Sequence, residues 1–123
     1  MTKYTKLDIN EDIQVGDLIS LIAIPNKVTR SVDNKFLNKD NIVGICMQIN
    51  SDNTIFVTDK GIVTVNVEGI ICIGDKLKVS NIPGKAKAIK YDQDELQFNI
   101  RSIGKVIKLY NDYSKADILL GIE

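Results

Sequence analysis

The stretch Ile62-Val63-Thr64-Val65-Asn66-Val67-Glu68 decides the fold class. Its three valines occupy alternate positions, and the residues between them are Thr64, Asn66 and Glu68. A period of two is expected of a β-strand that has one buried and one exposed face. We therefore predict a half-buried strand at this place in the chain.

Similar runs of strand length lie on both sides of this stretch, and turn residues separate them roughly every 8 to 15 positions. Further strands are predicted over residues 17–24, 42–49, 54–58, 76–80, 103–109 and 116–122. Helical patterns are confined to residues 31–40 and 93–99, where each has room for at most two turns. The pattern predicts an all-β fold, in the form of a single compact β-barrel or sandwich.

Composition limits the chemistry that the chain can perform. Its 123 residues suit one domain, and sixteen Lys and Arg balance sixteen Asp and Glu. A zero net charge gives no general attraction to nucleic acid or to anionic lipid. The sequence contains no His, which removes every catalytic arrangement that depends on imidazole. We expect no enzymatic activity, no metal and no other cofactor.

The termini and the cysteines indicate where the protein is made. The N-terminal residues lack the apolar core and the cleavage site of a secretory signal. No apolar run approaches the roughly 20 residues that span a bilayer, so we expect no membrane segment. Cys46 and Cys72 each lie within an apolar run, which is typical of small buried side chains. A disulfide between them is the minority alternative.

Two Gly-Asp pairs reveal an internal repeat. Three landmarks recur at an offset of 58 positions: Gly16-Asp17 with Gly74-Asp75, Pro25 with Pro83, and Lys27 with Lys85. Gly44 matches Gly104 at an offset of 60, and residues 55–57 match residues 118–120 at 63. A chance match is the alternative. The repeat predicts two halves, about residues 14–61 and 72–123, that share one core in a pseudo-twofold barrel of residues 14–123.

The Gly-Asp pairs allow two interpretations. Asp17 and Asp75 could act as a general acid and base if both faced one pocket. The favoured interpretation is architectural, because glycine supplies the unusual backbone angle of a tight turn and the aspartate accepts hydrogen bonds from nearby N–H groups. Such turns resemble the GD box of duplicated β-barrels. The predicted structural turn residues are Gly16, Asp17, Pro25, Gly74, Asp75, Pro83 and Gly84.

A basic stretch and a polar N-terminal segment could contact partners. The basic stretch contains Lys76, Lys78, Lys85, Lys87 and Lys90 with no acidic and no aromatic residue between them. A solvated strand face is favoured there over a nucleic-acid surface, which would need stacking side chains. Residues 1–13 form either the first strand or an arm that adds a strand to a neighbour. The apolar residues of that candidate arm are Tyr4, Leu7 and Ile9.

Four segments together resemble a known family: residues 61–69, 73–77, 82–86 and 103–107. They read as a strand of alternating valines between two glycines, a Gly-Asp turn, a Pro-Gly turn followed by small residues, and an Ile-Gly step into a closing strand. This order resembles the small β-barrel capsid decoration and head-fibre proteins of tailed phages, and similar modules occur in tail fibres. The first half departs from the pattern, because Asn26 follows Pro25.

The resemblance implies a non-enzymatic virion protein with no catalytic residues. The leading hypothesis is a capsid decoration protein, made in the bacterial cytoplasm, that binds the major capsid protein on the exterior of the virion and stabilises the shell. The resemblance also implies self-association, with a trimer as the first expectation. A tail, fibre or baseplate component is the alternative within this class. A duplicated β-barrel that binds DNA as a regulator is the alternative from another class.

Overall fold

The computed structural model describes residues 1–23, 26–33, 41–90 and 102–122 of the chain. All regular elements among these residues are strands, which confirms the prediction of an all-β fold. The helical pattern of residues 93–99 and the turn residue Pro25 lie outside the described residues. Residues 34–40 of the other helical pattern also lie outside them, and residues 31–33 are not helical.

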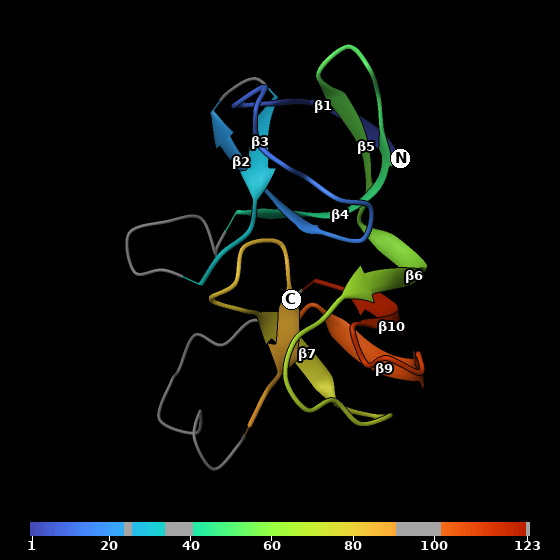
Figure 1. The fold of residues 1–123 in the computed structure, drawn as a ribbon. Coiled ribbons are helices and arrows are strands. Elements are labelled where there is room, and N and C mark those ends of the chain that lie inside the picture. Colours follow the sequence, from blue (N-terminus) through green and yellow to red (C-terminus); the bar gives the residue numbers. More distant parts are fainter. Residues whose placement is uncertain (24–25, 34–40, 91–101, 123) are drawn as a thin grey trace.

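The first five strands form a closed barrel in the order β1-β3-β2-β4-β5 (Figure 1). They are β1 (Thr2–Lys6), β2 (Leu18–Ala23), β3 (Lys27–Arg30), β4 (Ile42–Ile49) and β5 (Thr54–Thr58). Strand β1 closes this first barrel, because it pairs antiparallel with β5 and parallel with β3. The N-terminal segment therefore contributes a strand to its own chain.

The last five strands form a second sheet in the order β6-β10-β9-β7-β8. They are β6 (Lys60–Asn66), β7 (Lys76–Val79), β8 (Ala86–Ala88), β9 (Gly104–Leu109) and β10 (Lys115–Gly121). Every neighbouring pair in this second sheet is antiparallel. One parallel bridge, between Val67 and Ala86, joins the chain beyond β6 to β8 at the other edge.

The two sheets are built on the same plan. When β1–β5 are matched in order with β6–β10, each antiparallel pairing in the first barrel has its counterpart in the second sheet. The bridge from Val67 to Ala86 corresponds to the parallel pairing of β1 with β3. Even the β-bulges coincide, because Met47 in β4 and Ile107 in β9 are the residues skipped by the register. Strand order and bulges therefore show a structural repeat.

The boundary between the repeats differs from the one expected from the sequence. The first barrel ends at Thr58 and the second sheet begins at Lys60, whereas the predicted halves omitted β1 and most of β6. Cys46 pairs with Val57, and Val106 pairs with Ile118, so β5 and β10 match at an offset of 61. The predicted offset of 63 was two residues too long. A shift of two leaves each side chain on the same face, which hides the error in the sequence pattern.

The structure has two core clusters in place of the single shared core that the repeat predicts. The cluster inside the first barrel includes Ile19, Val28 and Ile55, all from the first half. The cluster of the second sheet also takes in Leu18 of β2 and Ile45 of β4. Figure 1 shows the first barrel stacked on the second sheet, with β4 on the side of the barrel that faces it. The first barrel therefore covers one side of the second core.

Only one of the two cysteines is buried. Cys46 lies in the core of the first barrel, but Cys72 is exposed, so the prediction that both are buried was wrong for Cys72. In the segment before β7, Ile71 is the residue that packs into the second core. Its neighbour Cys72 consequently faces solvent. Both thiols are free.

Candidate functional site

The two Gly-Asp turns have the same hydrogen-bond geometry. Gly16 and Gly74 adopt φ angles of 94° and 93°, which are accessible to glycine at little cost. Asp17 Oδ2 accepts a hydrogen bond of 2.8 Å from the backbone N–H of Gln14. The equivalent oxygen of Asp75 accepts one of 2.9 Å from the N–H of Cys72. Each carboxylate therefore holds the turn that leads into the next strand.

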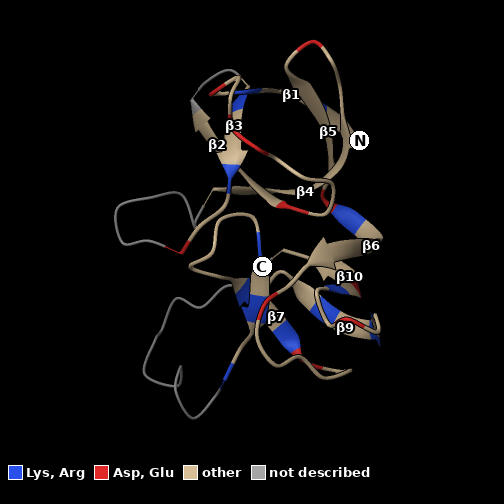
Figure 2. Ribbon diagram, viewed as in Figure 1, with Lys and Arg blue, Asp and Glu red and all other residues tan. Residues whose placement is uncertain are grey.

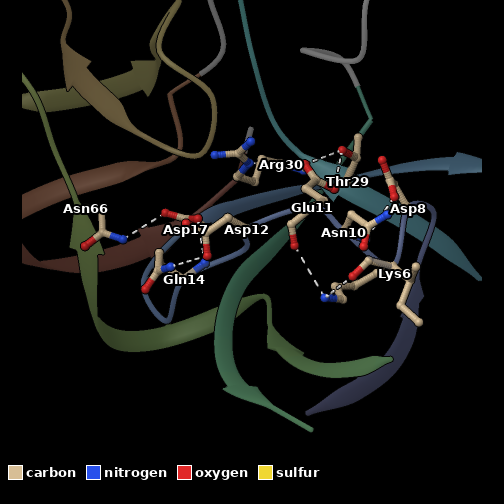
Figure 3. A network of polar contacts seen from close by, with 11 residues as sticks. Lys6, Asp8, Asn10, Glu11, Asp12, Gln14, Asp17, Thr29, Arg30 and Asn66 are labelled. Atoms are coloured by element: carbon tan, nitrogen blue, oxygen red, sulfur yellow. Dashed lines mark hydrogen bonds and ion pairs between the residues drawn. The ribbon is translucent and has the colours of Figure 1, made fainter. Parts of the chain in front are cut away.

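Asp17 has a second role that Asp75 does not share. It is only 4% exposed, and its Oδ1 accepts a hydrogen bond of 2.8 Å from Asn66 Nδ2 at the end of β6 (Figure 3). Asn66 also donates to the carbonyl of Val15 and accepts from Lys115 Nζ at 2.9 Å. Burial raises the pKa of Asp17, while its two hydrogen bonds partly offset that effect. Asp17 and Asn66 therefore join the two sheets.

The predicted Pro-Gly turn lies at the same junction. Gly84 is buried and its φ is +82°, and a Cβ there would lie 2.7 Å from the carboxyl carbon of Asp17. Its carbonyl accepts a hydrogen bond of 2.8 Å from the N–H of Leu18, and its N–H donates to the carbonyl of Ser31. Pro83 is exposed. The turn between β7 and β8 therefore reaches across to the first barrel, which only glycine at position 84 allows.

A further carboxylate network, which the sequence did not predict, lies in the first barrel. Glu11 accepts hydrogen bonds from Thr29 Oγ1 and from the backbone N–H of Arg30. Its Oε2 also lies 3.1 Å from Arg30 Nε, which makes an ion pair (Figure 3). These contacts fasten the long connection between β1 and β2 to β3. The network is structural.

The two repeat aspartates do not form a catalytic pair in the structure. Asp17 lies between the sheets, whereas Asp75 occupies the separate turn before β7. Neither of the two surface grooves described below is lined by Asp17 or Asp75. Among the described residues, no three His, Cys, Asp or Glu side chains gather in a way that could hold a metal ion. In the same part of the chain, no helix has the length and hydrophobicity to cross a membrane.

The predicted basic residues lie on or next to strands β7 and β8 of the second sheet (Figure 2). Lys78 on β7 and Lys87 on β8 are direct cross-strand partners, and Lys76 on β7 is the partner of Lys105 on β9. Lys76 and Lys90 are exposed, Lys85 and Lys87 are half-buried, and Lys78 is 8% exposed. A groove of about 180 Å³ lies over β7 and β8. Its lining residues are Glu68, Gly69, Ile70, Lys78, Lys87, Ala88 and Lys90.

The residues of the candidate arm are divided. Tyr4 lies in β1 and is half-buried against the core of the first barrel. Leu7 and Ile9 are exposed in the connection that follows β1. The N–H of Leu7 donates a hydrogen bond of 2.8 Å to the carbonyl of Val28, and the N–H of Glu68 makes the equivalent bond to Ala86. The strand that contains Tyr4 is therefore part of the repeat.

An exposed row, which the sequence reading did not single out, crosses the second sheet. Ile62 on β6 pairs with Leu119 on β10, which pairs with Lys105 on β9, which pairs with Lys76 on β7. Ile62 is 67% exposed and Leu119 is 56% exposed. Alternation predicts that these side chains share the outer face, but sequence alone does not place them side by side. We call these four residues the outer row.

A second groove of about 330 Å³ lies where the two core clusters meet. Its lining residues are Tyr4, Ile42, Val43, Asp59 and Ile122. Val43 and Tyr4 pack on the core of the first barrel, and Ile42 and Ile122 pack on the second core. Asp59, between β5 and β6, supplies the single charge of this groove and is exposed. We call it the junction groove.

Comparison with known proteins gives no relatives from which a role could be transferred. No family model, no curated protein and no solved structure matches the chain.

Proposed function

We propose that the chain is a non-enzymatic structural protein of a tailed-phage virion, and specifically a capsid decoration protein. In this role it binds the major capsid protein on the exterior of the shell, stabilises the shell and associates with copies of itself. The resemblance of residues 61–69, 73–77, 82–86 and 103–107 to decoration and head-fibre proteins supports the assignment to a virion.

The observation that carries the proposal is the outer face of the second sheet. Two pairs of lysines lie directly opposite each other on neighbouring strands, Lys78 with Lys87 and Lys76 with Lys105. Like charges in directly opposed positions destabilise a sheet. The exposed pair of Lys76 and Lys105 and the half-buried Lys87 offer cations on this face to an acidic partner surface. A shell of capsid protein can offer such a surface.

Exposed apolar side chains near the lysines favour a protein partner over DNA. Ile70 lines the groove over β7 and β8, and Ile73 is exposed in the turn before β7. Interfaces between proteins combine apolar centres with polar rims. Binding to DNA would use phosphate contacts, and no aromatic side chain lies in the stretch from Lys76 to Lys90 for stacking on bases.

Sedimentation with capsids tests the proposal. The purified protein is mixed with expanded, DNA-free capsids or with tail tubes, and the bound fraction is measured at increasing protein concentration. We expect saturable binding to capsids at a fixed stoichiometry and no binding to tails. The double variant Lys85→Glu, Lys87→Glu should weaken binding by at least about tenfold. Lys3→Glu and Lys27→Glu in the first barrel make the matched control.

Other outcomes would assign the protein elsewhere. Binding to tail tubes alone would favour a tail, fibre or baseplate component. Binding to duplex DNA that falls steeply as salt increases would favour a regulator. Either result would contradict the assignment to the capsid exterior.

A further inference from the structure

Two donors of β3 hold a carboxylate in the first barrel. The Thr29 hydroxyl donates to Glu11, and the backbone N–H of Arg30 donates to Glu11 Oε2 at 3.1 Å (Figure 3). The N–H of the next residue, Ser31, donates to the carbonyl of Leu18. Alternation along the strand therefore turns the N–H of Arg30 away from β2, so it needs an acceptor outside the pairing of β2 with β3.

Strands β7 and β8 repeat this arrangement. They pair in the same register as β2 and β3, at the offset of 58 positions that relates the two Gly-Asp turns. Lys87 therefore takes the position of Thr29, and Ala88 takes that of Arg30. The hydroxyl donor of the first barrel is replaced by an ammonium donor, and the backbone donor is kept.

The backbone N–H of Ala88 lacks the acceptor that its counterpart has. The N–H of Ile89 donates to the carbonyl of Lys76 on β7, so alternation turns the N–H of Ala88 away from β7. Ala88 is 4% exposed, and its N–H makes no hydrogen bond to the part of the chain that the structure describes. A buried N–H group is nearly always paired. This donor borders the groove over β7 and β8, which Ala88 lines.

The connection that supplies Glu11 has a shorter counterpart in the second half. The first connection runs ten positions from Leu7 to Asp17, and its equivalent runs only seven from Glu68 to Asp75. Residues 69–74 of the shorter connection contain no carboxylate. The groove over β7 and β8 lies between this connection and β8, on the side where Glu11 lies in the first barrel.

The groove carries an excess of positive charge. Three of its lining residues are Lys78, Lys87 and Lys90, and Glu68 is the single acidic residue among the described ones that line it. Glu68 does not replace Glu11 as the acceptor, because its Oε1 accepts a hydrogen bond of 2.8 Å from the Ser80 hydroxyl. The groove therefore combines a buried backbone donor with a surplus of ammonium groups, which suits an anion with two oxygens.

We propose that the groove over β7 and β8 binds a carboxylate side chain of a partner protein, in the position that Glu11 fills in the first barrel. One carboxylate oxygen accepts from the N–H of Ala88 and the other accepts from Lys87 Nζ. Lys78 and Lys90 complement the charge. The inference deepens the proposed function and rests on it for the identity of the partner, whose carboxylate belongs to an Asp or Glu of the capsid protein.

Titration of the intact chain, labelled with nitrogen-15, tests the site by nuclear magnetic resonance. The probe is a short peptide with blocked ends and one glutamate, and its counterpart has glutamine in that place. We expect a saturable shift of the Ala88 amide resonance with the glutamate peptide and none with the glutamine peptide. Lys87→Gln should weaken binding by at least about fivefold. Lys76→Gln removes an exposed lysine that does not line the groove, and it is the matched control.

A carboxylate supplied by the chain itself should close the site. Ile70 lines the groove and is 79% exposed, so Ile70→Glu adds a local carboxylate without disturbing the core. We expect this variant to shift the Ala88 resonance in the direction of the bound form and to lose binding of the glutamate peptide. Ile73→Glu adds the same charge at an exposed position that does not line the groove, and it should bind the peptide like the wild type.

Several results would overturn the inference. They are an Ala88 resonance that does not respond to the glutamate peptide, equal responses to the two peptides, and tighter binding of inorganic phosphate than of the glutamate peptide. The titration needs no capsid, so failure of this site and failure of the capsid assignment are separate results. Sedimentation of Ile70→Glu with capsids tests the partner, and binding as strong as that of the wild type would show that no capsid carboxylate occupies the groove.

Discussion

The two halves of the chain share one strand order but complete it differently. In the first barrel β1 makes two consecutive parallel pairs with β3, Thr5 with Lys27 and Lys6 with Val28. In the second sheet the same position is held by the single bridge between Val67 and Ala86. The first half is therefore a closed barrel, and the second half is a nearly closed copy of it.

The core clusters show what completes the second half. Leu18 and Ile45 belong to strands of the first barrel, yet they pack in the core of the second sheet. Among the described residues, the core of the first barrel takes none from the second half. The repeat has thus produced one self-contained unit and one that depends on its neighbour. Changes in the first barrel should therefore affect both halves, whereas changes in the second sheet should act locally.

Alanine at Gly44 or at its repeat counterpart Gly104 should cause the largest loss of stability. A Cβ on Gly44 would lie 2.0 Å from the carbonyl oxygen of Thr58, and one on Gly104 would lie 2.5 Å from that of Leu119. Both contacts are with backbone, so the paired strands must separate. We expect Gly44→Ala to cost more than about 4 kcal/mol and to unfold both halves. Gly104→Ala should damage mainly the second sheet.

Circular dichroism and urea unfolding measure this difference. Gly121→Ala in β10 is the control, because no atom lies within 4 Å of its added Cβ. A Gly44→Ala protein with the urea midpoint of the wild type would contradict the close strand approach.

Truncation of Leu18 should have the next largest effect. Leu18 is fully buried, and Leu18→Ala should cost about 2–5 kcal/mol through lost burial and a cavity. Its neighbour Ile19 points into the other core, so Ile19→Ala is the matched variant. Amide exchange should show lost protection first in β7, β9 and β10 for Leu18→Ala. Loss confined to the first barrel would show that Leu18 does not complete the second core.

Removal of the Asn66 side-chain amide, which joins the two sheets, should cause a smaller loss of stability. Asn66→Ala removes the hydrogen bonds to Asp17 and to Val15 and leaves a buried carboxylate with one donor fewer. We expect a loss of about 1–3 kcal/mol in urea unfolding. The exposed Asn81 serves as the control, and Asn81→Ala should leave the midpoint near that of the wild type. Equal losses for the two variants would refute a special role for Asn66.

The buried carboxylate makes stability depend on pH. Burial raises the pKa of Asp17 above 3.8, so the folded state holds the proton more tightly than the unfolded state. The stabilisation of the folded state that comes from the protonated Asp17 is present at acidic pH. It is lost as the pH rises from about 4 through the raised pKa. The difference in unfolding free energy between the wild type and Asp17→Asn should therefore fall over that range. A difference that stays constant or rises over that range would argue against burial as the cause.

The smallest change in stability is expected for an ion pair on the surface of the first barrel. Lys3 Nζ, on β1, lies 3.8 Å from Asp52 Oδ2, in the turn between β4 and β5. Both side chains are more than half exposed. Exposed pairs of this kind contribute little to stability. Lys3→Ala should leave the urea midpoint unchanged within error. A clear loss of stability would mean that closure of the barrel by β1 depends on this pair.

Local sequence signals predicted much of this architecture. Alternating valines place β6, and the Gly-Asp pairs place the turns before β2 and β7, because both signals act over a few residues. The short strands β3 and β8 were missed, since each has four residues or fewer and gains its place by pairing with distant chain. The sequence allowed either a first strand or an arm at β1, because this strand is also held by pairing with distant parts of the chain.

The candidate surfaces were less accessible to prediction. The lysines of the basic stretch are evident in the sequence, but their direct opposition across β7 and β8 depends on register. The outer row joins four strands whose order cannot be read from local patterns. The bond between Asp17 and Asn66 spans 49 positions and belongs to the junction between the sheets. Superposition of the two repeats is needed to see that, within residues 1–23, 26–33, 41–90 and 102–122, Asp75 has no equivalent side-chain partner.

Native-state hydrogen exchange on the wild-type chain shows whether the first barrel is self-contained and whether it completes the second sheet. In increasing denaturant, amides of β7, β9 and β10 should exchange through an opening that leaves β2, β4 and β5 protected. Exchange in the reverse order, or one opening free energy for both sheets, would contradict the account.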